Sequence, residues 1–450
     1  MRFLPDREDT TTAVIGLGYV GSCLAATLAD TGMNVVGVDT DPLLVEELEV
    51  GTCRFKDPGL PELLAQGVSA GRLRVTTDYQ AVSSADVVIV AVGTPIREQG
   101  LLMDAQLRSA CAQLGPHIRP GQLVIVKSTV PPGTMRELVV PLLEAGGLTC
   151  GTDFGLAFCP ERLSQGAALS ELRNLPIVVG GWCTASTEAA AQFWRRTIGV
   201  TPVPCSSMET AEVVKLANNW WVDHNIALAN ELAQFCSAMG VDAIEVIKAT
   251  NAVPKGAGSV NVLLPGVGVG GSCLTKDPWM VWRAARDKGV ELQTIATARA
   301  VNDSMPAYTA GLIVDELEKL GKRPEESRVA VIGLAFKNNT GDVRSTPTAP
   351  VVAELIEAGA DVALFDTLVD PADAKTIFGV GLASSVEEAV EGADCLAVLA
   401  WHREFEDLDL NALRGHAAER CVIVDGRAHF SAERVEALRA SGFVYRGIGR

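Results

Sequence analysis

The sequence lacks several features that would mark a membrane-spanning, secreted or metal-binding protein. No apolar run reaches the ~18–20 residues that a transmembrane helix requires, and the start, MRFLPDREDTTT, has no apolar stretch like that of a secretory signal. The 11 cysteines are scattered, without a CxxC pair or a His-rich cluster. We therefore expect a reduced, cytoplasmic protein with neither a disulfide framework nor a metal site.

Positive charge is also scarce. The chain has 38 Lys and Arg against 55 Asp and Glu, which gives a formal net charge of −17. Such a surface repels phosphate backbones and anionic lipids, so we expect neither nucleic acid nor a membrane as a partner. The hydrophobic fraction of 48% is that of a globular protein. Because 450 residues are too many for one core, several domains are expected.

One pattern of strands and helices occurs twice in the chain. Apolar strands alternate with helical stretches near the N-terminus and again near the C-terminus, at residues 12–21, 34–39 and 85–95 and then at 328–337, 359–366 and 392–400. Continuous apolar strands separated by helices are typical of parallel sheets covered on both faces. The sequence therefore predicts an α/β protein with two Rossmann-like, doubly wound parallel-sheet domains.

The segment between these two halves has a different periodicity. From Met208 to about Thr250, and from Asp277 to about Leu320, apolar residues recur at three- and four-residue spacing, which predicts long helices. We expect domains at 1–205, 206–322 and 323–450, with the helices joining the two sheets. A long helix with an apolar face favours a homodimer or higher homo-oligomer. The alternative is that this helix packs within its own chain.

The first strand leads into a glycine-rich turn. Gly16, Gly18 and Gly21 fit the G-x-G-x-x-G pattern between a strand and a helix. In this pattern the glycines allow a tight turn, the approach of a pyrophosphate and close helix packing. Asp39 ends the next strand, where a carboxylate accepts hydrogen bonds from a ribose and repels a 2′-phosphate. Residues 1–205 are thus predicted to bind NAD rather than NADP.

A second glycine-rich segment surrounds a cysteine. Residues 265–278 have the sequence PGVGVGGSCLTKDP, in which Lys276 and Asp277 closely follow Cys273. Glycines let a ligand approach the backbone, and a nearby ammonium favours the nucleophilic thiolate. The alternative is a buried cysteine in a glycine-rich loop.

Other polar residues lie where they could serve chemistry. Lys215 and Asn219 share one face of the predicted helix, and together they could polarise an oxyanion. The alternative for Lys215 is a solvated surface residue. Glu161 follows the apolar segment GLAFC. Lys337 lies at the end of segment 328–337, where a cation suits a phosphate or a sugar hydroxyl.

Together these segments resemble the UDP-glucose/GDP-mannose dehydrogenase family of nucleotide-sugar 6-dehydrogenases. The resemblance covers about residues 12–430 and rests on GLGYVG, VGTP (92–95), KSTVPPGT (127–134), CPERL (159–163), AEVVKLANN (211–219), NIALANEL (225–232), GGSCLTKDP and GLAFKNNTGDVRSTP (333–347). It implies a four-electron oxidation of a sugar C6 alcohol to the uronic acid. In that reaction a hydride passes to NAD, the cysteine adds to the aldehyde, a second hydride leaves, and the thioester is hydrolysed.

The resemblance also implies roles for individual residues. Catalysis would involve Cys273, Lys215, Asn219, Asp277, Glu161 and Thr129, with Asp277 acting through a water. The cofactor would contact Gly16, Gly18, Tyr19, Val20, Gly21, Asp39, Thr94, Thr129, Lys276 and Arg344. The nucleotide sugar would contact Glu161, Arg162, Leu163, Lys215, Asn219, Gly270 and Lys337, with its nucleotide against residues 323–450. No metal is implied.

Departures from the family pattern bear on which sugar is used. Where many relatives have a second carboxylate, this chain has Gln165, and where they often have a basic residue near the ribose, it has Leu44. The arginine that in many relatives reaches a neighbouring subunit's sugar has no clear counterpart here; Lys255 is the nearest cation, and Ser259 stands about where that arginine would be expected. The loop TGDVRS replaces the more usual TDDIR. The segment GGSCxxKD, with Ser272, resembles glucose-type enzymes, whereas PGVGVGG, the DP after Lys276 and DHNIALANEL resemble N-acetylhexosamine types.

The sequence favours a UDP- or TDP-glucose-type substrate, with a UDP-N-acetylhexosamine as the alternative. Two further alternatives belong to other classes. A single-step hydroxyacid dehydrogenase would leave Cys273 idle and give no reason for the second α/β domain. A non-catalytic sensor would bind NAD and a nucleotide sugar without turnover.

Overall fold

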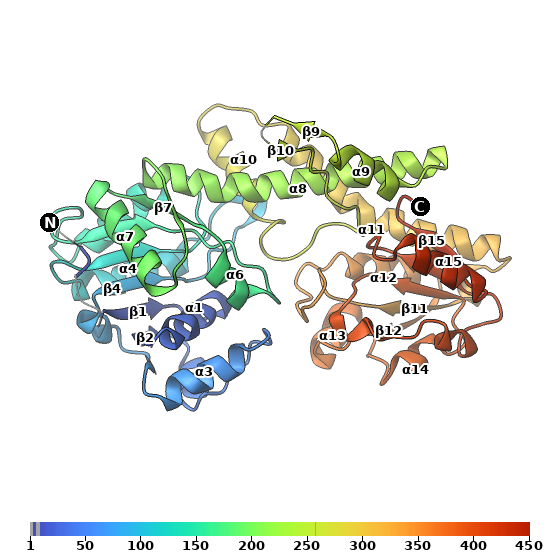
Figure 1. Ribbon diagram of the computed structural model, residues 1–450, viewed down its shortest axis with the longest axis horizontal. Helices are drawn as coiled ribbons and strands as arrows, with labels where there is room; N and C mark the ends of the chain where they lie inside the picture. Colours follow the sequence, from blue (N-terminus) through green and yellow to red (C-terminus); the bar gives the residue numbers. More distant parts are fainter. Residues whose placement is uncertain (1–2, 6–9, 257) are drawn as a thin grey trace. The chain divides into compact units, whose positions relative to one another are not determined.

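The computed structural model describes residues 3–5, 10–256 and 258–450, and the chain divides into two compact units (Figure 1). The first unit comprises Met1–Asn218 and Lys276–Glu291, and the second comprises Asn219–Thr275 and Leu292–Arg450. Each unit contains one large sheet with helices on both of its faces (Figure 1). The boundary between the units falls inside the central segment that was expected at 206–322.

The first unit is built on an eight-stranded sheet with the strand order β3-β2-β1-β4-β5-β6-β7-β8. Its strands are β1 (Thr11–Ile15), β2 (Asn34–Val38), β3 (Leu73–Thr76), β4 (Val87–Val90), β5 (Leu123–Val126), β6 (Gly155–Phe158), β7 (Ile177–Gly181) and β8 (Pro202–Pro204). The order of β1 to β6 is that of a dinucleotide-binding Rossmann sheet. The parallel arrangement that was expected holds up to β6, whereas β7 pairs with β6 in antiparallel orientation.

The described part of this unit contains eight α-helices besides the start of the long helix that follows β8, and most of them lie against the faces of the sheet. They are α1 (Tyr19–Asp30), α2 (Pro42–Glu49), α3 (Leu60–Ser69), α4 (Ala105–Leu114), α5 (Val140–Glu144), α6 (Ala168–Asn174), α7 (Thr184–Thr197) and α10 (Asp277–Asp287). Successive side chains of a strand point to opposite faces. Accordingly Val14 of β1 belongs to one buried cluster, and its neighbours Ala13 and Ile15 belong to another. The continuous apolar strands of the sequence are therefore buried on both sides.

The second unit has a five-stranded, fully parallel sheet with the order β12-β11-β13-β14-β15. Its strands are β11 (Arg328–Ile332), β12 (Asp361–Phe365), β13 (Cys395–Val398), β14 (Val422–Asp425) and β15 (Val444–Gly447), and its flanking helices are α12 (Thr348–Glu357), α13 (Pro371–Phe378), α14 (Val386–Val390) and α15 (Ala432–Ala440). This is the other common doubly wound order. Two Rossmann-like domains in one chain were predicted, and the prediction is confirmed.

The predicted long helices are present but interrupted. They are α8 (Met208–Met239), α9 (Ala243–Asn251) and α11 (Thr294–Lys319), and β9 (Pro254–Lys255) pairs with β10 (Gly258–Ser259) close to α9 in sequence. Each of the two predicted long helices is interrupted near a glycine with positive φ, Gly240 at 68° and Gly289 at 76°. Among the described residues, no helix is long and apolar enough to span a membrane.

Candidate active site

The glycine turn after β1 has the geometry that a dinucleotide needs. Gly16 has φ 87°, and a Cβ on Gly21 would lie 1.8 Å from the Gly16 carbonyl oxygen, so both positions exclude a side chain. A Cβ on Gly18, in contrast, would meet nothing within 4 Å. Helix α1 begins directly afterwards at Tyr19, so its N-terminal N–H groups lie beside this open space. The turn thus fits a pyrophosphate over Gly18.

Asp39 lies at the end of β2 and closes the turn from the other side. Its carboxylate accepts hydrogen bonds from the Leu17 N–H at 2.6 Å and the Asp41 N–H at 3.0 Å. The side chain is only half-buried, which leaves room for a ribose. Thr94 lies beyond the end of the adjacent strand β4 and is buried. Val20 is the second residue of α1.

Tyr19 makes a contact that the sequence did not reveal. Its hydroxyl donates to the buried carboxylate of Asp57, and the Gly166 N–H donates to the same oxygen at 2.7 Å. Burial, followed by the hydrogen bond to Asp57, raises the pKa of Tyr19. Asp57 therefore ties the glycine turn to the segment that follows Glu161. The only signal in the sequence was an Asp-Pro-Gly turn before α3.

A buried ion pair lies beyond the adjacent strands β5 and β6. Lys127 Nζ is 3.1 Å from Glu161 Oε2, and the Lys127 side chain is 2% exposed. The ammonium also lies 5.0 Å from the centre of the Trp194 ring. Glu161 Oε1 accepts hydrogen bonds from the N–H groups of Arg162 at 2.6 Å and Leu163 at 2.7 Å. Glu161 is thus a fixed carboxylate whose charge Lys127 balances, and its side chain organises the predicted substrate segment.

Thr129 is half-buried on the segment after β5, and α8 holds that segment in place. Glu212 of α8 is fully buried and accepts hydrogen bonds from the Gly133 N–H at 2.6 Å and the Met135 N–H at 2.9 Å. Burial raises the pKa of Glu212 to about 7. The carboxyl group therefore fixes the loop that carries Thr129 to the helix that carries Lys215.

Lys215 and Asp277, which the sequence places 62 positions apart, form an ion pair in the first unit. Lys215 Nζ lies 3.7 Å from Asp277 Oδ2, and Lys276 Nζ donates to Asp277 Oδ1 at 2.7 Å. The Lys215 side chain is 7% exposed and that of Asp277 is 1% exposed. Lys215 is thus not the solvated residue of the alternative interpretation. One carboxylate lies between two ammonium groups, which leaves excess positive charge for a developing oxyanion.

In the second unit, Cys273 is exposed on its glycine-rich loop. A Cβ on Gly270 would lie 2.3 Å from the Ser345 carbonyl oxygen, and one on Gly271 would lie 2.6 Å from the Phe336 ring. These two glycines therefore let the cysteine loop pack directly against residues 334–347. The predicted nucleophile and the predicted nucleotide-sugar segment are neighbours within one unit.

Arg344 lies in that segment and is exposed, and its guanidinium hydrogen-bonds both carboxylate oxygens of Asp342. These bonds, with a smaller contribution from the charge of Cys273, hold the pKa of Arg344 above its usual value. The ammonium of Lys276 donates to Asp277 at 2.7 Å. Lys337 is half-buried on the same segment, and Asn219 is half-buried on α8.

The described residues contain no group of three or more His, Cys, Asp or Glu side chains suited to a metal ion. The chemistry they offer is instead that of a dinucleotide turn, an accessible thiol, and ammonium groups around Asp277. The sequence had not singled out Lys127, Asp57 and Glu212 as functional residues. Each acts through a partner far away in the chain.

Models of one protein family match three successive parts of the chain. The NAD-binding domain of the UDP-glucose/GDP-mannose dehydrogenase family matches residues 10–198, its central domain matches 209–304, and its UDP-binding domain matches 330–432.

Individual relatives resemble the chain over nearly its whole length. A UDP-N-acetyl-D-mannosamine dehydrogenase of Pyrococcus horikoshii is 33% identical and covers 97% of this chain and 99% of its own. A UDP-glucose 6-dehydrogenase of Haloferax volcanii is 34% identical over 92% of this chain and 96% of its own. The solved structure of a UDP-D-ManNAc dehydrogenase from Pyrococcus horikoshii has a TM-score of 0.85 at 32% identity, covering 98% and 99% of the two chains.

Proposed function

The chain belongs to the UDP-glucose/GDP-mannose dehydrogenase family of NAD-dependent nucleotide-sugar dehydrogenases, and from this premise we propose that it oxidises a hexose C6 alcohol to the carboxylate. The observation that carries the proposal is the exposed thiol of Cys273 on a loop packed against residues 334–347. A simple hydroxyacid dehydrogenase needs no nucleophilic cysteine. The same thiol argues against a non-catalytic sensor.

The first half of the reaction is a two-electron oxidation. The glycine turn would hold NAD as the hydride acceptor; C6 would lose a hydride to it and the C6 hydroxyl a proton, which gives the aldehyde. We assign to Lys215 the stabilisation of the C6 oxygen as negative charge develops, with Asn219 as a second polar donor. The buried ammonium suits this role because electrostatic stabilisation is strongest where water is excluded.

The second half is covalent. The Cys273 thiolate forms an S–C bond to the aldehyde carbon, and the carbonyl oxygen becomes the oxyanion of a thiohemiacetal. A second hydride leaves C6 to another NAD, which gives the thioester. Water then attacks, the C–S bond breaks, and the thiol and the carboxylate form. Asp277 is assigned the orientation of this water and the transfer of its proton.

The remaining residues bind and align. Asp39 is assigned to the adenosine ribose, and Thr94, Val20 and Lys276 to other parts of the cofactor. The segment after Glu161, with Arg162 and Leu163, is assigned to the sugar. Residues 323–450, which contain the match to the UDP-binding domain, are assigned to the nucleotide, with Lys337 against the diphosphate.

Two sugars are candidates. Ser272 and the Lys276–Asp277 pair around the cysteine favour UDP- or TDP-glucose, the first candidate. The names of relatives that act on UDP-N-acetyl-D-mannosamine, at 33–34% identity, favour a UDP-N-acetylhexosamine as the second. A relative named UDP-glucose 6-dehydrogenase, at 34% identity, supports UDP-glucose as well.

The test is a stopped assay with UDP-glucose, TDP-glucose, UDP-N-acetylglucosamine and UDP-N-acetylmannosamine, in which NADH and sugar product are counted together. Two NADH per carboxylate are expected. One NADH per product would refute the four-electron reaction, and no turnover with any nucleotide sugar would refute the proposal as a whole.

The nucleophile is tested with Cys273→Ser. Serine stays protonated at neutral pH, so overall turnover should collapse while NAD and nucleotide-sugar binding persist. Cys53→Ser, at a half-buried cysteine of the first unit, is the matched control and should keep full activity. Undiminished carboxylate production by Cys273→Ser would rule out the covalent step.

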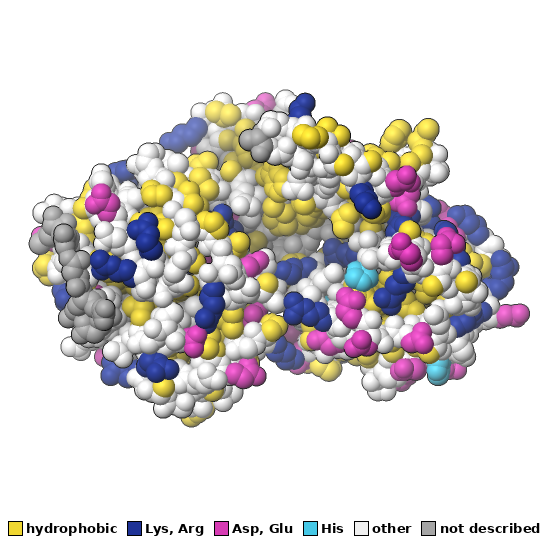
Figure 2. Space-filling model, viewed as in Figure 1, with side chains coloured by type: hydrophobic (Ala, Val, Ile, Leu, Met, Phe, Trp, Pro, Cys, Tyr) yellow, Lys and Arg dark blue, Asp and Glu magenta, His cyan; other side chains and the backbone are white. Residues whose placement is uncertain are grey.

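We further propose that the enzyme is a homodimer or a higher homo-oligomer that uses α8. Trp221, Leu228, Phe235 and Met239 are exposed by 48%, 49%, 63% and 62%. Their spacing of seven, seven and four residues puts them on one face of the helix. Figure 2 shows hydrophobic side chains gathered where α8 ends near α9. An exposed apolar stripe of this kind is typical of a contact between protein chains.

Light scattering after size exclusion tests the assembly. Phe235→Glu should shift the mass from the oligomer to the monomer, because a carboxylate would enter an apolar contact. Leu43→Glu, at another exposed leucine on α2, is the matched control and should leave the mass unchanged. A wild-type chain that is monomeric at micromolar concentration would contradict this part of the proposal.

A further inference from the structure

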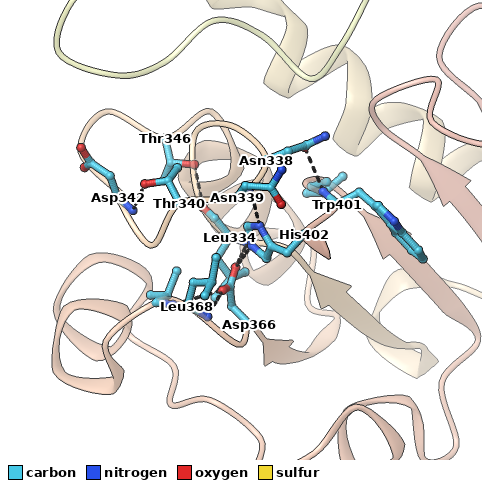
Figure 3. A network of polar contacts seen from close by, with 12 residues as sticks. Leu334, Asn338, Asn339, Thr340, Asp342, Thr346, Asp366, Leu368, Trp401 and His402 are labelled. Carbon is cyan, nitrogen blue, oxygen red and sulfur yellow. Dashed lines mark hydrogen bonds and ion pairs between the residues drawn. The ribbon is translucent and has the colours of Figure 1, made fainter. Parts of the chain in front are cut away.

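His402 is buried just beyond the end of β13 and is held on both sides of its ring (Figure 3). Its Nε2 lies 3.0 Å from Oδ2 of Asp366, a buried residue at the end of β12. Asp366 also accepts hydrogen bonds from the N–H groups of Leu334 at 2.7 Å, Leu368 at 2.8 Å and Val369 at 3.1 Å. The carboxylate is thus fully engaged.

The other ring nitrogen fixes the tautomer. The Asn339 N–H donates to Nδ1 of His402 at 2.9 Å, so Nδ1 is an acceptor and carries no proton. In a neutral imidazole the proton then resides on Nε2, from which it is donated to Asp366. A proton on Nδ1 would face the proton of the Asn339 N–H. The surroundings therefore fit the Nε2–H tautomer of His402.

Two asparagine side chains accept hydrogen bonds from the residues on either side of His402. Asn338 Oδ1 accepts from the Trp401 N–H at 2.9 Å, and Asn339 Oδ1 accepts from the Arg403 N–H at 2.8 Å. Asn339 adopts φ 59°, a left-handed conformation that must be held by its surroundings. Figure 3 shows both asparagines pointing toward the chain around His402. Residues 338–339 and 401–403 are thus joined by three hydrogen bonds.

The residue before Lys337 is fixed from a third strand. Arg427, which follows β14, donates to the carbonyl oxygens of Phe336 and Leu399, each at 2.7 Å. Burial lowers the pKa of Arg427 to about 10. Lys337 therefore lies between an anchored Phe336 and an anchored Asn338. Every anchor comes from the carboxyl end of a parallel strand, where such sheets bind ligands.

We propose that His402 is a positioning residue that holds residues 336–339 in the conformation that presents Lys337 to the nucleoside diphosphate of the substrate. The proposal rests on the proposed function and adds a residue that touches neither substrate nor cofactor. Loss of His402 should weaken nucleotide-sugar binding and leave NAD binding intact. A residue needed only for stability would change both or neither.

Two substitutions separate the two sides of the ring. His402→Gln keeps a donor near the position of Nε2 and loses the acceptor for Asn339, whereas His402→Asn keeps an acceptor near Nδ1 and loses the contact with Asp366. We expect His402→Gln to raise the KM for the nucleotide sugar about tenfold, which corresponds to one lost hydrogen bond. The KM for NAD and kcat should stay within twofold. His402→Asn should lie nearer to wild type.

The matched control is His416→Gln, since His416 is an exposed histidine paired with Glu391 in the same unit. It should leave both KM values unchanged. If His402→Gln fails to fold, Asn338→Ala provides the test, because it frees the Trp401 N–H and spares the His402–Asp366 pair. An unchanged KM for the sugar, or equal rises for sugar and NAD, would overturn the proposal.

Two binding measurements do not depend on activity. Histidine ¹⁵N spectra of the wild-type protein should show one of the five histidines as a fixed Nε2–H tautomer, a signal that disappears in His402→Gln. Calorimetry should show weaker binding of UDP to His402→Gln. An Nδ1–H tautomer, or UDP affinity equal to wild type, refutes the positioning role. Absence of sugar oxidation by the wild-type enzyme, with these two results as expected, refutes the proposed function instead.

Discussion

At the end of β1 and at the end of β11 the chain makes the same turn. Gly16 and Gly333 have φ 87° and 77°. In each case the N–H of the following leucine donates to an aspartate at the end of the neighbouring strand, Leu17 to Asp39 at 2.6 Å and Leu334 to Asp366 at 2.7 Å. Up to this point the two halves of the molecule are built alike.

The two turns differ in the segment after the glycine and in the surroundings of the acid. After Gly16 the chain enters α1 at Tyr19, whereas after Gly333 residues 334–347 precede α12. Asp39 is half-buried, but Asp366 is buried and bound by His402. The turn itself therefore does not select the ligand. The half-buried acid and adjacent helix suit a dinucleotide, and the occupied acid and inserted segment suit a different ligand.

The largest expected effect separates the two turns directly. Gly18→Val adds a side chain where nothing lies within 4 Å, so the protein should fold normally, but the pyrophosphate loses its space. NAD affinity should fall at least ~100-fold, about 3 kcal/mol, while UDP affinity is unchanged. Calorimetry measures both. Gly381→Val, equally open in the second unit, is the control; NAD affinity within twofold of wild type for Gly18→Val would break the comparison.

The next effect compares the two acids. Asp366→Asn would place an amide N–H₂ among the donors of Leu334, Leu368 and His402, and should cost about 1–3 kcal/mol of unfolding free energy. Asp39→Asn should cost less and should lower NAD affinity instead. Urea unfolding measures the difference. Equal destabilisation by the two substitutions would show that the acids are equivalent.

The pH dependence of Asp366 comes from the same contacts. Burial alone would raise the pKa of this carboxyl, but the hydrogen bond and the electrostatic interaction with His402, together with the hydrogen bonds from the backbone amides, outweigh burial and hold the pKa below the ordinary 3.8. A lowered pKa means that the stabilisation is present above the unfolded value and is lost as pH falls through the folded value. The difference in unfolding free energy between wild type and Asp366→Asn should therefore become smaller below about pH 4, as urea unfolding at several pH values would show.

The smallest effect concerns Glu212 in the first unit, whose pKa moves in the opposite direction. Burial raises it from 4.5 to about 7, so its stabilisation is complete below 4.5 and is lost as pH rises through 7. Between pH 5.5 and 6.5 the wild-type protein should lose at most about 1.4 kcal/mol that Glu212→Gln does not lose. Urea unfolding at the two pH values tests this. An equal change in unfolding free energy for wild type and Glu212→Gln would contradict it.

The sequence predicted those features that local pattern determines. Continuous apolar runs indicated the parallel strands, and glycines at fixed spacing indicated the NAD turn. Cys273 was recognisable because glycines and charged residues surround it within one short segment. The glycines at 240 and 289 were present in the sequence, but periodicity alone did not show that each interrupts a helix. Periodicity likewise did not show that β7 runs antiparallel.

The features that escaped prediction depend on partners far away in the chain. His402 meets Asp366 at a separation of 36 residues, and Asp57 meets Gly166 at a separation of 109. Lys127 lies at the end of an apolar strand, where only the fold brings Glu161 beside it. A buried charged residue with a distant partner has no local signature, because its desolvation is compensated by tertiary structure.

Cys273 has a practical consequence for any reagent that alkylates thiols. All 11 cysteines lie in the described part of the chain, and Cys273 alone among them is exposed. Burial raises the pKa of Cys111 and Cys421 to about 12 and that of Cys159 to about 11, so at neutral pH these remain unreactive thiols. One equivalent of iodoacetamide should therefore act as a titrant of competent molecules, and the fraction of chains carrying a single mass increment would equal the fraction of activity lost.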